Sequence, residues 1–162
     1  MAVDRERWWF LPTALIAAFV FTAMPLPGGA ATARPDWVAL VLVYAAIFMP
    51  QRWILTTAMI AGLLLDALQG TPLGQYALAL AIAVFGPLRL HLRLSLVPVW
   101  QSMSATLVAL ALYQFVLFWC NGATGNDLGA LAYLVPVVTG TLAWPVLVFL
   151  LDAARLERRP SD

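Results

Sequence analysis

The chain has 162 residues, of which 63% are hydrophobic and only 10% are charged, and its mean hydropathy is +0.88. A soluble domain carries about 25% charged residues, so this composition excludes a soluble globular fold and indicates a protein whose solvent is lipid. The formal net charge of +1 gives no indication of a nucleic-acid partner.

Apolar runs separated by proline, glycine and charged residues predict an all-α polytopic membrane protein with six transmembrane helices in a single integral membrane domain. A span needs about 20 apolar residues. The second and third runs are shorter, so the sequence leaves open whether both cross the bilayer fully. The predicted spans are residues 8–24, 36–50, 53–68, 73–89, 98–119 and 131–151.

The first run also has features of a secretory signal peptide, since a basic start and an apolar stretch precede the small residues Ala31-Thr32-Ala33. The run is long for a signal peptide, however, and Trp8-Trp9 is typical of an interfacial anchor. We therefore expect a retained span with Pro12 near its first turn, where proline is tolerated. In the fourth run, Pro87 is expected to mark the inner end of the helix.

The nine positively charged residues are all arginines, and they fall into alternate connections between the runs. Loops on the cytoplasmic side of a membrane carry the excess of basic residues. One assignment of sides places eight arginines inside and predicts that both termini are cytoplasmic. Only Arg34 is then outside; the inside group is Arg5, Arg7, Arg52, Arg89, Arg93, Arg155, Arg158 and Arg159.

Asp66 is the ionisable residue that most needs an explanation, because a carboxylate in an apolar helix is costly and normally faces the protein interior or a partner. Gly62, Asp66 and Gly70 are four residues apart and share one helix face. Glycines allow a neighbouring helix to approach closely, so this face is predicted to be a packing seam. Gly70 to Gly74 is predicted to form a tight outside turn.

Arg34, Pro35 and Asp36 open the second run on the side where the third run ends. An arginine fork suits a carboxylate geometrically, so we expect Arg34 to pair with Asp66 or Asp36 at the outer interface. Such a pair would hold two helices together. The sequence leaves open a role of Arg34 in binding a partner or a ligand.

Enzyme signatures are absent from the sequence: no phosphate-binding glycine loop, zinc-binding His-Glu-x-x-His helix or Gly-x-Ser-x-Gly turn is present. His91 and Cys120 are the only residues of their kinds, and they cannot build a metal site of their own. We therefore expect no catalytic residue, metal or cofactor. The sequence also leaves open a proton-coupled transporter that uses Asp66.

Three segments together resemble the rod shape-determining MreD family. They are Arg34-Pro35-Asp36-Trp37, the stretch from Ala61 to Gly74 with its Gly-x3-Asp-x3-Gly-x3-Gly pattern, and Gly140-Thr141-Leu142-Ala143-Trp144-Pro145. The resemblance covers essentially the whole chain. It implies a non-enzymatic scaffold in the bacterial inner membrane, with a fold similar to the substrate-binding subunits of energy-coupling-factor transporters.

The resemblance also implies partners. MreD-like proteins bind MreC, through its transmembrane and membrane-proximal part, and act with MreB, RodA and the elongation-specific penicillin-binding protein in rod shape and peptidoglycan synthesis. Membrane lipid is a further expected contact. Small residues and kinked helices favour helix association, so Gly140, Trp144 and Pro145 are candidate partner-binding residues. The alternative function is a small-molecule-capturing membrane subunit of a transporter, although the outside loops offer few polar groups for a pocket.

Overall fold

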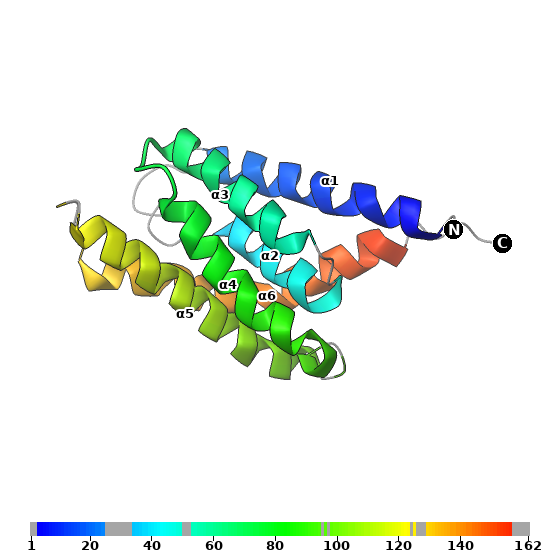
Figure 1. Cartoon of the computed structure of the whole chain (residues 1–162). Helices are drawn as coiled ribbons and strands as arrows, with labels where there is room; N and C mark the ends of the chain where they lie inside the picture. Colours follow the sequence, from blue (N-terminus) through cyan, green and yellow to red (C-terminus); the bar gives the residue numbers. More distant parts are fainter. Residues whose placement is uncertain are drawn as a thin grey trace.

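The computed structural model describes residues 3–24, 34–49, 53–94, 96, 98–123, 125 and 129–156. Within these ranges the chain is all-helical, as predicted, and forms six α-helices (Figure 1). Their bounds are α1 Val3–Ala23, α2 Trp37–Phe48, α3 Ile54–Gln69, α4 Gln75–Leu94, α5 Val99–Ala123 and α6 Ala130–Leu156. Each predicted span coincides with one of these helices.

The helices run alternately up and down. Consecutive pairs from α3 to α6 pack side by side, and α1 packs on α2. The ends of α1, α3 and α5 and the beginnings of α2, α4 and α6 meet at one end of the bundle. We call it the cavity end, because residues from the other five helices and from the segment just before α2 line one cavity there. Arg34 and the Asp66 helix end lie together at this end, as the sequence predicts.

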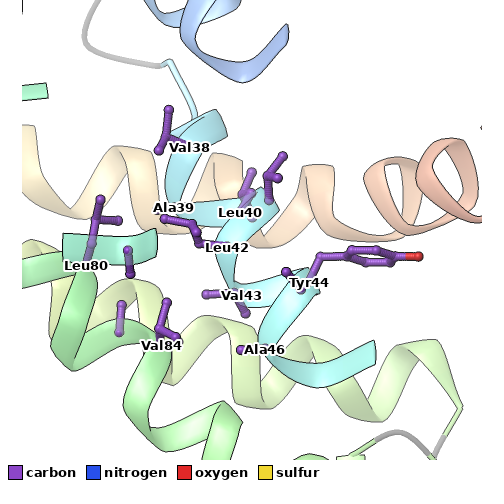
Figure 2. Close-up of a cluster of buried hydrophobic side chains, with 14 of the residues drawn as sticks. Val38, Ala39, Leu40, Leu42, Val43, Tyr44, Ala46, Leu80 and Val84 are labelled. Carbon is purple, nitrogen blue, oxygen red and sulfur yellow. The ribbon is translucent and has the colours of Figure 1, made fainter. Parts of the chain in front are cut away.

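Helix α2 is the centre of the fold (Figure 1). All ten residues from Val38 to Ile47 are buried, and α2 contacts every other helix. Figure 2 shows its side chains leaving the helix on several sides, with Tyr44 pointing away from Leu80 and Val84 of α4. A helix that is hydrophobic all round belongs in a core rather than at a surface, which explains why a short helix carries such an apolar sequence.

Three of the described helical segments are long and apolar enough to cross a membrane, namely Gln75–Arg93, Val99–Ala123 and Leu131–Ala154. The segments Phe10–Ala23, Trp37–Phe48 and Ile54–Gln69 are apolar but shorter. Large hydrophobic side chains are widely exposed on the outer helices, among them Phe115, Leu142 and Phe149. Such a surface is typical of a protein surrounded by lipid.

Two predictions about prolines are wrong. Helix α4 does not end at Pro87 but continues to Leu94. Proline restricts the preceding residue by a clash with its Cβ, and the residue before Pro87 is Gly86, which has none. Pro12 lies well inside α1, because that helix begins at Val3 rather than near Trp8.

Several residues used in the topology prediction lie outside the described structure. Residues 31–33 of the possible cleavage site, Arg52, Arg158 and Arg159 are outside the described ranges, and the side chains of Arg5, Arg7, Trp8, Trp9 and Arg155 are not described. The membrane sidedness inferred from them therefore stays a prediction.

Gly62 allows the closest approach between α3 and α4. A Cβ atom built on Gly62 would lie 2.2 Å from the Cα of Ala77, 2.4 Å from its backbone nitrogen and 2.7 Å from the carbonyl carbon of Tyr76. All three are backbone atoms, which cannot move aside as a flexible side chain can. Close packing on the predicted seam is thus observed at Gly62, against another helix of the same chain, whereas a Cβ on Gly70 would meet no atom within 4 Å.

We predict that Gly62→Ala lowers the free energy of unfolding by about 1–3 kcal/mol, because the added methyl forces α3 and α4 apart. Thermal unfolding of the purified protein in detergent measures this change. Gly122→Ala, near the end of α5, is the matched control, since a Cβ there meets no atom within 4 Å. That change should be neutral or stabilising, by up to about 1 kcal/mol. Equal effects of the two variants would contradict the prediction.

Candidate functional site

Asp66 is 1% exposed, and its carboxylate accepts three hydrogen bonds. The Thr71 hydroxyl donates to Oδ1 over 3.0 Å, the Tyr76 amide donates to Oδ1 over 2.9 Å, and the Gly74 amide donates to Oδ2 over 2.8 Å. The first amides of a helix have no partner within that helix, and a negative charge there is favourable. Asp66 therefore caps the beginning of α4 from the preceding helix.

The two later glycines of the motif build the turn that brings the α4 amides to Asp66. Gly70 ends α3 in a left-handed conformation with φ 65°, and Gly74 has φ 101°. Residues other than glycine rarely adopt these angles. The amide of Thr71 also donates to the Asp66 carbonyl over 3.1 Å. The whole glycine and aspartate pattern thus specifies one α3–α4 hairpin, and it provides no support for proton transport through Asp66.

The predicted ion pair of Arg34 is wrong. Arg34 donates through Nη1 to the backbone carbonyl of Met24 over 3.0 Å, and among the described residues it forms no ion pair with either carboxylate. The Asp66 carboxylate instead accepts hydrogen bonds from the turn that begins α4. Asp36 accepts from the side-chain amide of Gln114 on α5 over 2.6 Å, so it joins the beginning of α2 to α5 instead.

A cavity of about 560 Å³ lies at the cavity end of the bundle. It contains more polar groups than the short outside loops led us to expect, because most of them come from helix ends rather than loops. Tyr76, Asn121 and Tyr133 also line the cavity, although we did not predict them as site residues. The feature that could have indicated them is a polar side chain within a turn or two of the outer end of an apolar helix. The lining is Thr22, Ala23, Arg34, Pro35, Asp36, Leu65, Leu68, Gln69, Tyr76, Gln114, Leu117, Asn121, Ala132, Tyr133 and Pro136.

An apolar groove of about 350 Å³ lies between α1 and α6, with α2 at its base. The α1 wall contains three alanines, Ala14, Ala17 and Ala18, and the α6 wall contains larger side chains, including Val146 and Leu150. Hence α1 and α6, which both pack on α2, leave room between them.

The partner-binding prediction for span six does not fit the positions of two of its residues. Trp144 is 0% exposed, and its indole nitrogen donates to the Ser102 hydroxyl of α5 over 3.0 Å. Gly140 is buried, with Leu110 Cδ1 2.7 Å from the position of an added Cβ. Both residues pack against α5 of the same chain. Pro145 is half-buried, and partner contact there stays a prediction.

We predict that Asp66→Ala lowers the free energy of unfolding by about 3 kcal/mol or more, because it leaves buried amides of the α4 turn without an acceptor. Thr71→Val removes only one of the three donors and should cost about 1 kcal/mol. Asp66→Asn should lie between them, since its amide group keeps one acceptor oxygen. Thermal unfolding of the three purified variants in detergent measures the order of their losses in stability. If Thr71→Val costs as much as Asp66→Ala, the capping explanation fails.

Comparison with known proteins adds evidence that is independent of the geometry. The family model described as rod shape-determining protein MreD matches residues 4–153. The chain is also 23% identical over 149 residues to the rod shape-determining protein MreD of Haemophilus influenzae, with 92% of each chain covered. No solved structure matches the chain.

The family match spans all six helices and includes the Asp66 hairpin, Arg34 and the buried tryptophan of α6. The structure thus gives physical reasons for motif residues that the sequence alone could only single out. The chain belongs to the MreD family of rod shape-determining membrane proteins.

Proposed function

We propose that this protein is a non-enzymatic scaffold of the bacterial inner membrane that binds the transmembrane segment of MreC in the groove between α1 and α6. The groove is the observation that carries the proposal. Its lining is apolar, and its α1 wall consists of Ala14, Ala17 and Ala18 with Phe21 at one end. Small residues let a second backbone approach closely, which is the main source of helix association in lipid.

The structure of α1 supports this choice of surface. Helix α1 packs mainly on α2 and leaves Ala17 exposed toward the groove. The outer faces of α4 and α5 instead present large side chains such as Leu78, Phe85 and Phe115. These faces suit acyl chains, which adapt to irregular surfaces, whereas a wall of alanines suits a helix.

Through MreC, the scaffold would act with MreB, RodA and the elongation-specific penicillin-binding protein in the control of peptidoglycan synthesis. The membrane-proximal part of MreC would contact the cavity end, which the distribution of arginines assigns to the outside. All six helices would cross the bilayer, with α2 shielded from lipid by its neighbours. Both termini would then be cytoplasmic.

A second candidate function is capture of a small molecule, by a fold like that of the energy-coupling-factor substrate-binding subunits. The polar cavity favours it, because small-molecule sites are concave and combine apolar walls with a few polar groups. A small molecule that is released from purified protein and restores transport in proteoliposomes would favour this function over the scaffold.

The scaffold proposal predicts that Ala17→Leu reduces copurification of tagged protein with MreC, because the larger side chain fills the groove. The loss should be about tenfold, the effect of removing a few well-packed contacts worth about 1.4 kcal/mol. Ala111→Leu on the exposed face of α5 is the control, and it should recover as much MreC as the wild type.

Both variants should reach the membrane in equal amounts and unfold at wild-type temperature. Equal recovery of MreC with both variants would move the interface away from the α1–α6 groove. Loss of MreC from both would point to an indirect effect. Gly140→Leu is unsuitable as an interface probe, because a side chain at position 140 would clash with the Leu110 side chain of the same chain.

The predicted topology has its own test. In a Cys120→Ser background, a cysteine at Leu73, which is 81% exposed in the α3–α4 turn, should react with a membrane-impermeant maleimide in intact cells. A cysteine at Ser161 in the tail should react only after the membrane is opened. The reverse pattern would overturn the assignment of sides.

A further inference from the structure

The cavity at the outer end holds hydrogen-bond donors that have no acceptor. Nε and Nη2 of Arg34 and the hydroxyl of Tyr133 are buried without a partner, and both residues line the cavity. Buried polar groups are almost always paired, and an unpaired group costs the protein stability. Three such donors around one cavity indicate a missing acceptor.

The orientation of Arg34 defines what that acceptor must be. Nη1 is fixed by its bond to the Met24 carbonyl, so the remaining edge of the guanidinium, formed by Nε and Nη2, is held in place. This edge has two parallel N–H groups whose spacing matches the two oxygens of a carboxylate or phosphate. A neutral acceptor would satisfy only one of them.

Tyr133 supplies a third donor from another helix. Its side chain is 8% exposed, and its ring packs edge-on against Phe118, with ring centroids 5.4 Å apart. The ring is therefore held in place, and the hydroxyl of this cavity-lining residue stays buried rather than free to turn into solvent. Since Arg34 precedes α2 and Tyr133 is on α6, a bound anion would join two helices.

Other charged groups nearby do not occupy the fork. Asp36 lies within electrostatic range of Arg34, but its Oδ2 atom accepts from Gln114. Asp66 is fully engaged by the α4 turn. The geometry of the fork, rather than a large positive charge, must select the ligand, so a single oxyanion group suits the cavity better than a highly charged one.

We propose that this cavity binds one oxyanion group, a carboxylate or phosphate, with two oxygens on Nε and Nη2 of Arg34 and a hydrogen bond from the Tyr133 hydroxyl. The apolar walls formed by Leu65, Leu68 and Leu117 accommodate the non-polar part of the ligand. The anion is either a phospholipid headgroup or a free small molecule. This binding goes beyond the scaffold function and does not depend on MreC.

The test uses delipidated full-length protein in neutral detergent and follows the unfolding temperature. One titration adds sodium phosphate, with sodium chloride at equal ionic strength as reference. The other adds phosphatidylglycerol in mixed micelles, with diacylglycerol, which lacks the phosphate, as reference. A ligand at concentration L that binds only the folded state stabilises it by RT ln(1 + L/Kd), so the unfolding temperature rises with the logarithm of the ligand concentration once that exceeds Kd.

Three variants locate the site. Arg34→Gln removes the fork and should weaken binding about tenfold or more, and Tyr133→Phe should weaken it about fivefold. Arg93→Gln, on the exposed surface at the other end of α4, should leave binding unchanged. Without ligand, Tyr133→Phe should unfold at or above the wild-type temperature, because it removes only an unpaired hydroxyl and keeps the ring contact. This behaviour separates a binding role from a merely structural one.

Stabilisation by phosphate supports a soluble oxyanion, and stabilisation by phosphatidylglycerol alone supports a lipid headgroup. Three results would overturn the proposal: no response of the wild type to either probe, a response to diacylglycerol equal to that to phosphatidylglycerol, or a wild-type response in Arg34→Gln.

Discussion

The burial of α2 from Val38 to Ile47 is the constraint on which the rest of this structure depends. A helix with ten consecutive buried residues needs neighbours on every side, and the other five helices supply them. Both ends of α2 are attached by polar contacts. Asp36 before its first turn binds Gln114 of α5, and Tyr44 near its end donates a hydrogen bond to Asp152 of α6. The central helix is thereby fixed in depth as well as in direction.

The Asp66 hairpin solves a second problem, the close packing of two antiparallel helices joined by a short turn. Gly62 brings the backbones together, and the carboxylate satisfies the amides that the turn exposes at the beginning of α4. The two features depend on each other. Asp66 can reach the amides of α4 only because the two helices lie close together, and the short connection between them needs the positive φ angles of Gly70 and Gly74. The carboxylate of Asp66 accepts three hydrogen bonds within the fold, whereas Nε and Nη2 of Arg34 have no partner among the described residues.

The sequence predicts the helices well and the contacts of individual side chains poorly. Apolar runs of sufficient length specify helices wherever they pack, so all six were found. A proline inside an apolar run does not have to end the helix, since Pro12 lies inside α1 and Pro136 and Pro145 lie inside α6. At Pro87 the preceding Gly86 also removes the Cβ clash. A face of small residues predicts close packing but does not say against which chain, so Gly62 was interpreted correctly while Gly140 and Trp144 were assigned to a partner. The partner of Asp66 was missed because backbone amides leave no trace in the side-chain pattern.

The position of α2 also has a consequence for synthesis of the protein at the ribosome. The α3–α4 hairpin is built from neighbouring segments and can form as soon as both have been made. Helix α2 emerges before it, yet its surroundings are supplied largely by α4, α5 and α6, which are translated later. During synthesis, the side chains of α2 therefore contact lipid or the insertion machinery until α4, α5 and α6 have been made and pack against them.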